Sequence, residues 1–298
     1  MKRKDPLYEQ NKYEHTSFPF EVYKIDKHSM HPHGRGFDNL HWHEEIQYTL
    51  AVKGSLTMQV NGQNYYLEEG EAIFINSQLL HVAKEMNEDG HYRSVNFNTK
   101  ILSFVRGSMM DQKYVLPYVN DYLLPVFIFQ KEIPWQNKIL ELLKEIDVIY
   151  ERRDFFAWEY RISILLCEIW YLILTNVKAE QRGDVAHLKL KQERIQNMLT
   201  YIHENYAGQI TIENIAHAAH ISVSECTRRF REYTGLSPYE YLIQYRISES
   251  CTALIKTNQS VAWIAESVGF QDASYFIQTF KKRTGTTPFK YRNAHKEP

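Results

Sequence analysis

Three histidines occupy positions from which their side chains can act together. His41 and His43 are two residues apart in a segment with strand character, and His81 ends a later apolar run. Side chains two apart on a β-strand point to the same face, so the two imidazoles share one side and His81 can meet them from a partner strand. Three imidazoles suit zinc, nickel, iron or copper better than magnesium. His41, His43 and His81 are therefore the candidate metal ligands, and no acid–base pair is evident beside them.

Two other roles for the same histidines stay open. They can hydrogen-bond a small effector in a pocket, or they can be interior histidines satisfied by neighbours, with no ligand role. The candidate pocket also includes polar and aromatic side chains near them in the sequence, and the full set is His41, Trp42, His43, Gln47, Tyr48, Tyr66, Phe74 and His81. Aromatic faces with a few polar groups suit a sugar or a similar polar metabolite.

A second kind of chemistry lies near the C-terminus, where polar side chains recur at helical spacing. In one stretch Val223, Cys226, Phe230 and Tyr233 form the apolar side, and in the other Ala273, Phe276 and Phe280 do so. The outward side chains are Ser222, Ser224, Thr227, Arg228, Arg231, Ser274, Gln278, Lys281 and Lys282. Hydroxyl, amide and guanidinium groups read base edges in the major groove, and lysines suit phosphates. These residues are the candidate DNA contacts.

The two stretches belong to an internal repeat. Ile212, Ile215 and Ala216 recur 49 residues later, and Phe230, Gly235, Pro238 and Tyr241 recur 50 residues later. A self-match of this length indicates one structural unit used twice. In each unit a Ser, Thr or Asp precedes each short apolar run, as expected of helix N-caps. The pattern predicts two helix-turn-helix units, at about 211–234 and 260–284.

Elements of a different kind must position the histidines. Residues 18 to about 100 alternate apolar and polar side chains in short runs with turn signals between them, including a hairpin around Asn61-Gly62. This pattern predicts a small antiparallel barrel. From residue 135 the apolar spacing becomes helical and predicts a hairpin of two helices.

The second of these helices carries a wide apolar stripe. Its central residues are Ile162, Leu165, Ile169 and Ile173, and Leu166, Trp170 and Leu174 widen it. Because oligomer interfaces use such surfaces, the stripe predicts a homodimer interface; the alternative is that the barrel and the helix at 135–150 cover it. The segment contains Glu168 and is shorter than a bilayer span, so no membrane association is expected.

Composition is that of a soluble two-domain protein. The chain has 298 residues, of which 44% are hydrophobic and 24% charged. The isolated cysteines Cys167, Cys226 and Cys251 indicate reduced thiols and a cytoplasmic location. Residues 1–186 hold 21 Lys and Arg against 26 Asp and Glu, whereas residues 187–298 hold 14 against 10. Basic charge at one end is consistent with a polyanionic partner there.

Residues 190–292 resemble the DNA-binding region of the AraC/XylS family of bacterial regulators. The most specific stretch runs from Ser260-Val-Ala-Trp-Ile-Ala-Glu-Ser-Val-Gly-Phe270 through Ser274-Tyr-Phe276 to Gly285-Thr-Thr-Pro288. The resemblance implies two helix-turn-helix units joined by a long helix near residues 239–255. It also implies reading helices that enter successive major grooves, roughly 34 Å apart.

The histidine region is similar to the two cupin motifs, which span residues 36–54 and 70–81. Gln47 occupies the position of the usual glutamate, and Asn76 and Gln78 replace the usual Pro and Gly. The similarity implies an antiparallel barrel that either binds a divalent transition metal or, as in the sensor domains of many AraC-type regulators, a small effector.

These observations together predict a multidomain fold. Residues 1–134 form an all-β cupin-like sensing domain, 135–177 a helical hairpin, 178–187 a linker and 188–298 an all-α DNA-binding domain. The expected function is effector-controlled, sequence-specific transcriptional regulation, with activation and contact to RNA polymerase implied by the family resemblance. The alternatives are a metal-dependent cupin enzyme, isomerase or dioxygenase, fused to a DNA-binding domain, and a repressor without an effector.

Overall fold

The computed structural model describes residues 7–11, 13, 17–32, 36–119, 124, 126–177 and 185–295. The chain divides into two compact units, of which the N-terminal one ends at Gln192 and the C-terminal one begins at Glu193. Most of the predicted linker, residues 178–184, lies outside the described residues. Among the described helices, none combines the length and the apolar character needed to cross a membrane.

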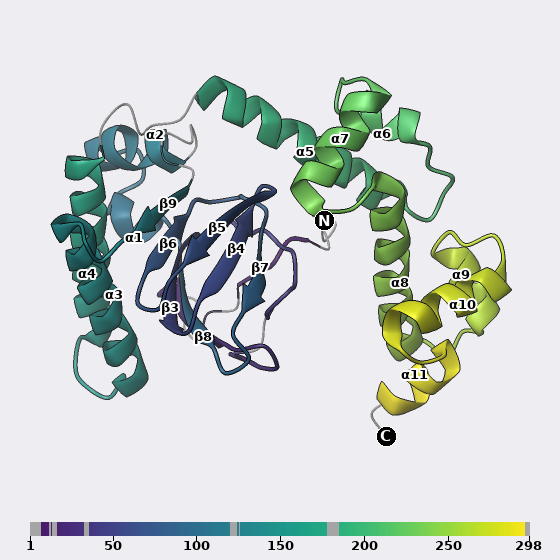
Figure 1. Ribbon diagram of the computed structural model, residues 1–298, viewed down its shortest axis with the longest axis horizontal. Helices are drawn as coiled ribbons and strands as arrows, with labels where there is room; N and C mark the ends of the chain where they lie inside the picture. Colours follow the sequence, from purple (N-terminus) through teal and green to yellow (C-terminus); the bar gives the residue numbers. More distant parts are fainter. Residues whose placement is uncertain are drawn as a thin grey trace. The chain divides into compact units, whose positions relative to one another are not determined.

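The N-terminal unit is built on two antiparallel sheets, as the alternating pattern predicts (Figure 1). The larger sheet has the order β2-β1-β8-β3-β6-β9 and the smaller one the order β5-β4-β7. The strands are β1 (Phe20–Ile25), β2 (Met30–His31), β3 (Ile46–Lys53), β4 (Leu56–Val60), β5 (Gln63–Leu67), β6 (Ala72–Ile75), β7 (His81–Met86), β8 (His91–Phe97) and β9 (Val126–Phe129). The predicted hairpin joins β4 to β5 through Asn61 and Gly62, which both have positive φ as this tight turn requires.

Both faces of the larger sheet are buried, but against different partners. Side chains such as Ile73, Ile75 and Tyr92 face the smaller sheet and form the barrel interior with Met58 and Leu67. The residues that alternate with them along the strands pack against helices and belong to a second core. A strand of this sheet therefore has no polar face that would mark its outside.

The helical hairpin covers the outer face of the larger sheet. It consists of α3 (Pro134–Arg152) and α4 (Trp158–Asn176), which lie side by side at the left of Figure 1. The short segments α1 (Lys100–Ser103), η1 (Met110–Val115) and α2 (Leu116–Val119) add to this layer, and the sequence patterns predict none of them. Asn76 ties the layer to the barrel because its amide donates to the carbonyl oxygens of Tyr118 and Leu124.

The predicted dimer stripe of α4 is used within the chain itself. Ile162, Leu165, Ile169 and Ile173 have no accessible surface and lie in the core shared with α3 and the sheet. The assignment of these four residues to an interface is therefore wrong, because a side chain with no accessible surface cannot contact a second chain. The sheet and α3 cover the whole stripe, which is the alternative left open by the sequence.

Every regular element described in the C-terminal unit is a helix, and the first of them begins before the boundary between the two units. Its elements are α5 (Val185–Asn205), α6 (Ile212–Ala218), α7 (Val223–Thr234), α8 (Pro238–Lys256), α9 (Val261–Ser267), α10 (Ala273–Thr284) and α11 (Pro288–His295). Side-chain caps start these helices where the sequence places them. Thr211, Ser222, Ser260 and Asp272 each accept a hydrogen bond from a backbone N–H of the first turn, and Ser237 and Glu240 form a capping box before α8.

Two helix-turn-helix units result, α6–α7 and α9–α10, joined by the long helix α8. Their inward residues include Cys226 and Phe230 in the first unit and Phe276 and Phe280 in the second, all with no accessible surface. Val223 differs from the expected inward face: it is 38% exposed because it is the first residue of α7, where no turn precedes it.

Candidate ligand site and nucleic-acid interface

The three histidines converge inside the barrel, as their spacing predicts. His41 and His81 form an isolated antiparallel bridge, with each backbone N–H donating to the other's carbonyl. One ligating nitrogen from each of His41, His43 and His81 lies within 4.8 Å of the others. His43 and His81 are 1% exposed and His41 is 9% exposed, so the cluster is shielded from solvent.

Backbone carbonyls set the proton positions of two of these rings. His41 Nδ1 lies 2.6 Å from the carbonyl oxygen of Asn39, and His81 Nδ1 lies 2.8 Å from that of Leu79. Because a carbonyl only accepts, each Nδ1 carries the proton and donates it. In the neutral ring each Nε2 then presents a lone pair, which is the arrangement that second-shell carbonyls impose on metal-binding histidines.

His81 is the least satisfied member of the cluster. Its Nε2 has no hydrogen-bond partner among the described residues, although the side chain is fully buried. Burial and, to a smaller extent, the neighbouring His43 lower the pKa of His81 to about 3, although the hydrogen bond to the Leu79 carbonyl opposes the shift. The ring is therefore neutral at physiological pH and offers an unused acceptor to the barrel interior.

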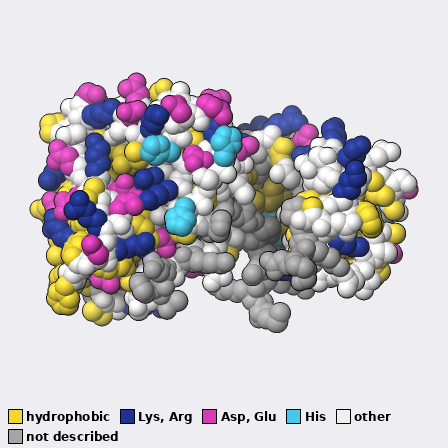
Figure 2. Space-filling model, turned by 90° about the horizontal axis from the view of Figure 1, so that it is seen from below, with side chains coloured by type: hydrophobic (Ala, Val, Ile, Leu, Met, Phe, Trp, Pro, Cys, Tyr) yellow, Lys and Arg dark blue, Asp and Glu magenta, His cyan; other side chains and the backbone are white. Residues whose placement is uncertain are grey.

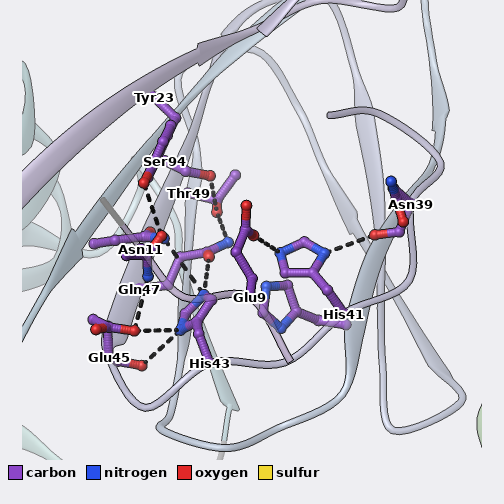
Figure 3. A network of polar contacts seen from close by, with 12 residues as sticks. Glu9, Asn11, Tyr23, Asn39, His41, His43, Glu45, Gln47, Thr49 and Ser94 are labelled. Carbon is purple, nitrogen blue, oxygen red and sulfur yellow. Dashed lines mark hydrogen bonds and ion pairs between the residues drawn. The ribbon is translucent and has the colours of Figure 1, made fainter. Parts of the chain in front are cut away.

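A polar network surrounds His43 (Figure 3). Its Nε2 lies 2.9 Å from Gln47 Oε1, and the contacts continue from Gln47 to Thr49 and from Thr49 to Ser94. A second branch links Asn11, Tyr23 and Glu45, with Asn11 Nδ2 2.8 Å from Glu45 Oε2. The network confirms that Gln47 faces inward. Thr49 and Ser94 were not predicted, although alternation from Gln47 would have pointed to Thr49.

An N-terminal segment supplies a carboxylate to the cluster. Tyr8 pairs with Trp42 in a parallel bridge, and the backbone N–H of Glu9 donates to the Trp42 carbonyl. This pairing places Glu9 Oε2 3.2 Å from His41 Nε2, in a side chain that is only 8% exposed (Figure 3). No local sequence signal marks Glu9, because its contact with His41 depends on a pairing between distant segments.

The space left at the cluster is small. Glu9, His41, Gln47, His81 and Asn96 line a cavity of about 20 Å³, together with apolar residues of the two sheets. One water needs at least about 10–15 Å³ of such volume, so the cavity has room for about one water or one ion. A sugar does not fit beside the Glu9 side chain in this arrangement.

Several of the predicted pocket residues lie elsewhere. Tyr48 and Phe74 are fully buried on the opposite face of the sheet, where their rings pack in the helix-side core. Tyr66 is 60% exposed on the outer face of β5, and Trp42 packs against Tyr8. The assignment of Tyr48, Phe74 and Tyr66 to the pocket is therefore wrong, because neighbours of inward residues on a strand point outward.

The donor set is compatible with a transition-metal ion. Imidazole nitrogens and a carboxylate oxygen are ligands that zinc and its neighbours bind, and the two second-shell carbonyls orient the rings of His41 and His81 for it. His43 would have to exchange its contact with Gln47 Oε1 for the ion. The unpartnered His81 Nε2 is the observation that favours this fit.

The predicted DNA contacts lie together on the outward sides of α7 and α10. Ser222, Ser224, Arg228 and Arg231 are exposed and Thr227 is half-buried in the first unit; Ser274, Gln278, Lys281 and Lys282 are exposed in the second. Two hydroxyls already have local partners, because Ser222 caps α7 and Thr227 donates to the Val223 carbonyl. Among the described residues, the partner of Arg228 is Glu232, in an exposed ion pair of 3.7 Å that a new partner can replace.

Both units of the chain are similar to known proteins. Residues 22–127 match a family model described as an AraC-like ligand binding domain, and residues 215–294 match one described as a helix-turn-helix domain. The chain is 31% identical over 278 residues to a Bacillus subtilis protein named uncharacterized HTH-type transcriptional regulator YdeC, covering 93% of this chain and 92% of that one. It is 32% identical over 248 residues to the lactose operon transcription activator of Staphylococcus xylosus, covering 82% of each.

Proposed function

This chain belongs to the AraC family of DNA-binding transcriptional regulators, and on that premise we propose that an effector bound in its barrel controls how α7 and α10 occupy specific DNA sites. The observation that carries the proposal is the pair of matched helices with exposed polar faces. Arg228 on α7 and Gln278 on α10 have the side-chain chemistry that reads base edges, and both are exposed. Lys281, one turn beyond Gln278, suits a phosphate.

The experiment compares specific with non-specific binding. A preferred duplex is first selected from random sequences with the full-length protein, and affinities for it and for an unrelated duplex are then measured by titration. Arg228→Ala and Gln278→Ala should each weaken binding to the selected duplex by about 1–3 kcal/mol while hardly changing the unrelated one. Lys281→Ala should weaken both and lower the salt slope by about one. Equal losses on both duplexes for Arg228→Ala would contradict the base-reading role.

We further propose that the chain activates transcription and does not repress it. A relative of similar length is named as a lactose operon activator, which supports activation and contact with RNA polymerase for this chain. A sugar-like effector would require the barrel interior to open beyond the small cavity beside Glu9. The alternative of a cupin enzyme rests only on the histidine cluster, and the alternative of an effector-independent repressor rests on no observation. A reporter gene behind the selected duplex should show higher expression with the regulator than without it if the chain is an activator.

A homodimer would bring two DNA-binding units to paired sites. The buried stripe of α4 is not available for this contact, but the opposite side of the same helix is apolar and exposed. Tyr160, Ile164 and Tyr171 are 73%, 45% and 64% exposed at positions i, i+4 and i+11, and Phe156 just before the helix is 99% exposed. Figure 2 shows hydrophobic side chains gathered along the left edge of the N-terminal unit, where Figure 1 draws this hairpin. An apolar surface of this kind supports the dimer.

A further inference from the structure

The outward faces of α7 and α10 can be compared position by position, because the internal repeat relates the two helices by 50 residues. On each helix, four outward side chains are spaced at i, i+3, i+4 and i+7 and therefore share one face. They are Ser224, Thr227, Arg228 and Arg231 on α7 and Ser274, Ile277, Gln278 and Lys281 on α10. The first position is a serine and the last a cation on both helices. The two central positions differ, so each helix presents its own chemistry at the middle of its face.

Ile277 is an apolar side chain on an otherwise polar face. It is 39% exposed, and the core of the second helix-turn-helix unit, which includes its neighbours Phe276 and Phe280, does not include it among the described residues. The side chain gains free energy when its area is removed from water, and it needs no hydrogen bond. In the major groove, the apolar group that a base pair offers is the C5-methyl of thymine. A thymine methyl is therefore the base feature that Ile277 fits.

Gln278 follows Ile277 and favours the same kind of base pair. Its amide both donates and accepts, which matches N6 and N7 of adenine in a bidentate contact. On α7 the equivalent residue is Arg228, whose guanidinium only donates and matches O6 and N7 of guanine. Thr227, the equivalent of Ile277, already donates its hydroxyl hydrogen to the Val223 carbonyl at 3.0 Å. The centre of α10 therefore suits A·T pairs, whereas the centre of α7 suits a G·C pair.

We propose that the chain reads a DNA site with two unlike segments, although the protein segments that read it are repeats. In the α10 segment of the DNA, Ile277 packs against a thymine methyl and Gln278 pairs with an adenine, and in the α7 segment Arg228 pairs with a guanine. The matched cations Arg231 and Lys281 contact phosphates in both segments and fix the register of each helix. The inference rests on the proposed function in taking α7 and α10 as reading helices, and it names the base pairs that they read.

Exchange of thymine for deoxyuridine tests the contact of Ile277, because the two bases differ only by the methyl group. The full-length protein is titrated with the selected duplex and with duplexes in which one thymine at a time is deoxyuridine. The α10 segment is located as the base pairs whose substitution no longer affects Gln278→Ala. For the wild type, one exchange in this segment should weaken binding by about fourfold, which corresponds to about 0.8 kcal/mol for one buried carbon. In Ile277→Ala the same exchange should have no effect, since the methyl has lost its partner.

Ile255→Ala is the matched control. Ile255 is also 39% exposed but lies on α8, outside the two reading faces, so this variant should keep the difference between thymine and deoxyuridine. The proposal is overturned if no exchange weakens binding by the wild type, or if Ile277→Ala keeps every difference that the wild type shows.

A double variant transfers the chemistry of α7 to α10. Ile277→Thr combined with Gln278→Arg gives α10 the central residues of α7, and a new selection from random sequences should then return a G·C pair where the wild type selects A·T. An unchanged selected sequence would contradict the assignment of these bases. Failure of the proposed function gives a different result, because Arg228→Ala would then weaken binding to the selected and the unrelated duplex equally. A selective loss in Arg228→Ala without any effect of deoxyuridine refutes the base assignment alone.

Discussion

At the scale of single residues, two arginines of the C-terminal unit have opposite surroundings. Arg246 is 8% exposed, and its guanidinium donates to the carbonyl oxygens of Tyr206 at 2.8 Å and Gly208 at 2.7 Å. These bonds tie α8 to the connection between α5 and α6. Arg228 is exposed, and its partner within the described part of the chain is Glu232, one turn away on its own helix. Its burial and hydrogen bonds therefore indicate that Arg246 stabilises the fold, whereas the exposed Arg228 is free to contact DNA.

We predict that Arg246→Met lowers the free energy of unfolding by about 3 kcal/mol. The substitution keeps the aliphatic volume but leaves the partly buried hydrogen bonds to Tyr206 and Gly208 without their charged donor, and hydrogen bonds to charged groups contribute about 1.5–3 kcal/mol each. Arg228→Met should change stability by less than about 0.5 kcal/mol, because the side chain is exposed. Urea unfolding followed by circular dichroism measures both values. A stability loss for Arg228→Met as large as that for Arg246→Met would contradict this division of roles.

At the scale of elements, the turns of the two helix-turn-helix units both need a residue with positive φ, but a different residue type occupies that position in each. Gly269 has φ of +92° after α9, and His220, which is 49 residues earlier, has φ of +54° after α6. The second turn is crowded: a Cβ at Gly269 would lie 2.6 Å from the Tyr206 carbonyl oxygen and 2.8 Å from Arg246 Nη2. Glycine is therefore required in the second turn by both conformation and space, whereas the first turn tolerates a side chain.

Gly269→Ala and Gly285→Ala separate these two causes. Both glycines have positive φ, but a Cβ at Gly285 would have no atom within 4 Å. We expect Gly285→Ala to destabilise the protein by about 1–2 kcal/mol, which is the left-handed backbone strain alone. Gly269→Ala should lose at least about 1 kcal/mol more, because a backbone oxygen cannot move aside as a flexible side chain can. Equal losses in thermal or urea unfolding would show that crowding at Gly269 is unimportant.

At the scale of the whole molecule, α4 has two apolar sides with different partners. The side that includes Ile169 is fully buried against the sheet and α3, and the side that includes Tyr160, Ile164 and Tyr171 is exposed. A dimer, if it forms through this hairpin, must use the exposed side.

A pair of charge substitutions tests this assignment. Ile164→Glu should leave the fold intact and convert a dimer to a monomer, because the new carboxylate stays in water in the monomer and is desolvated only in the interface. Ile169→Glu should instead unfold the N-terminal unit, since an unpaired buried charge costs several kcal/mol. Light scattering gives the oligomeric state and circular dichroism the fold. A folded, monomeric Ile169→Glu protein would show that the stripe of Ile169 faces a second chain and not the sheet and α3.

Features governed by local interactions were predictable from the amino-acid sequence. The hairpin at Asn61-Gly62 follows from a turn that needs positive φ, and the starts of α6, α7, α9 and α10 follow from capping side chains one residue earlier. The repeat identified two helix-turn-helix units because the same apolar and capping positions recur in each of them. The convergence of the histidines followed from strand geometry and a resemblance in spacing.

Tertiary structure decided which side of each strand forms the pocket and which residue completes it. Helices bury the outer face of the large sheet as fully as the small sheet buries the inner face, so Gln47 and Tyr48 are both inaccessible and the burial pattern cannot tell inside from outside. The stripe of Ile162 and Ile169 was ambiguous for the same reason, since an apolar helix face does not specify its partner. Glu9 reaches His41 because residues 7–9 pair with Trp42, more than 30 positions away in the sequence. A contact between distant segments depends on the packing of the whole unit. The residues next to Glu9 and His41 in the sequence therefore do not predict it.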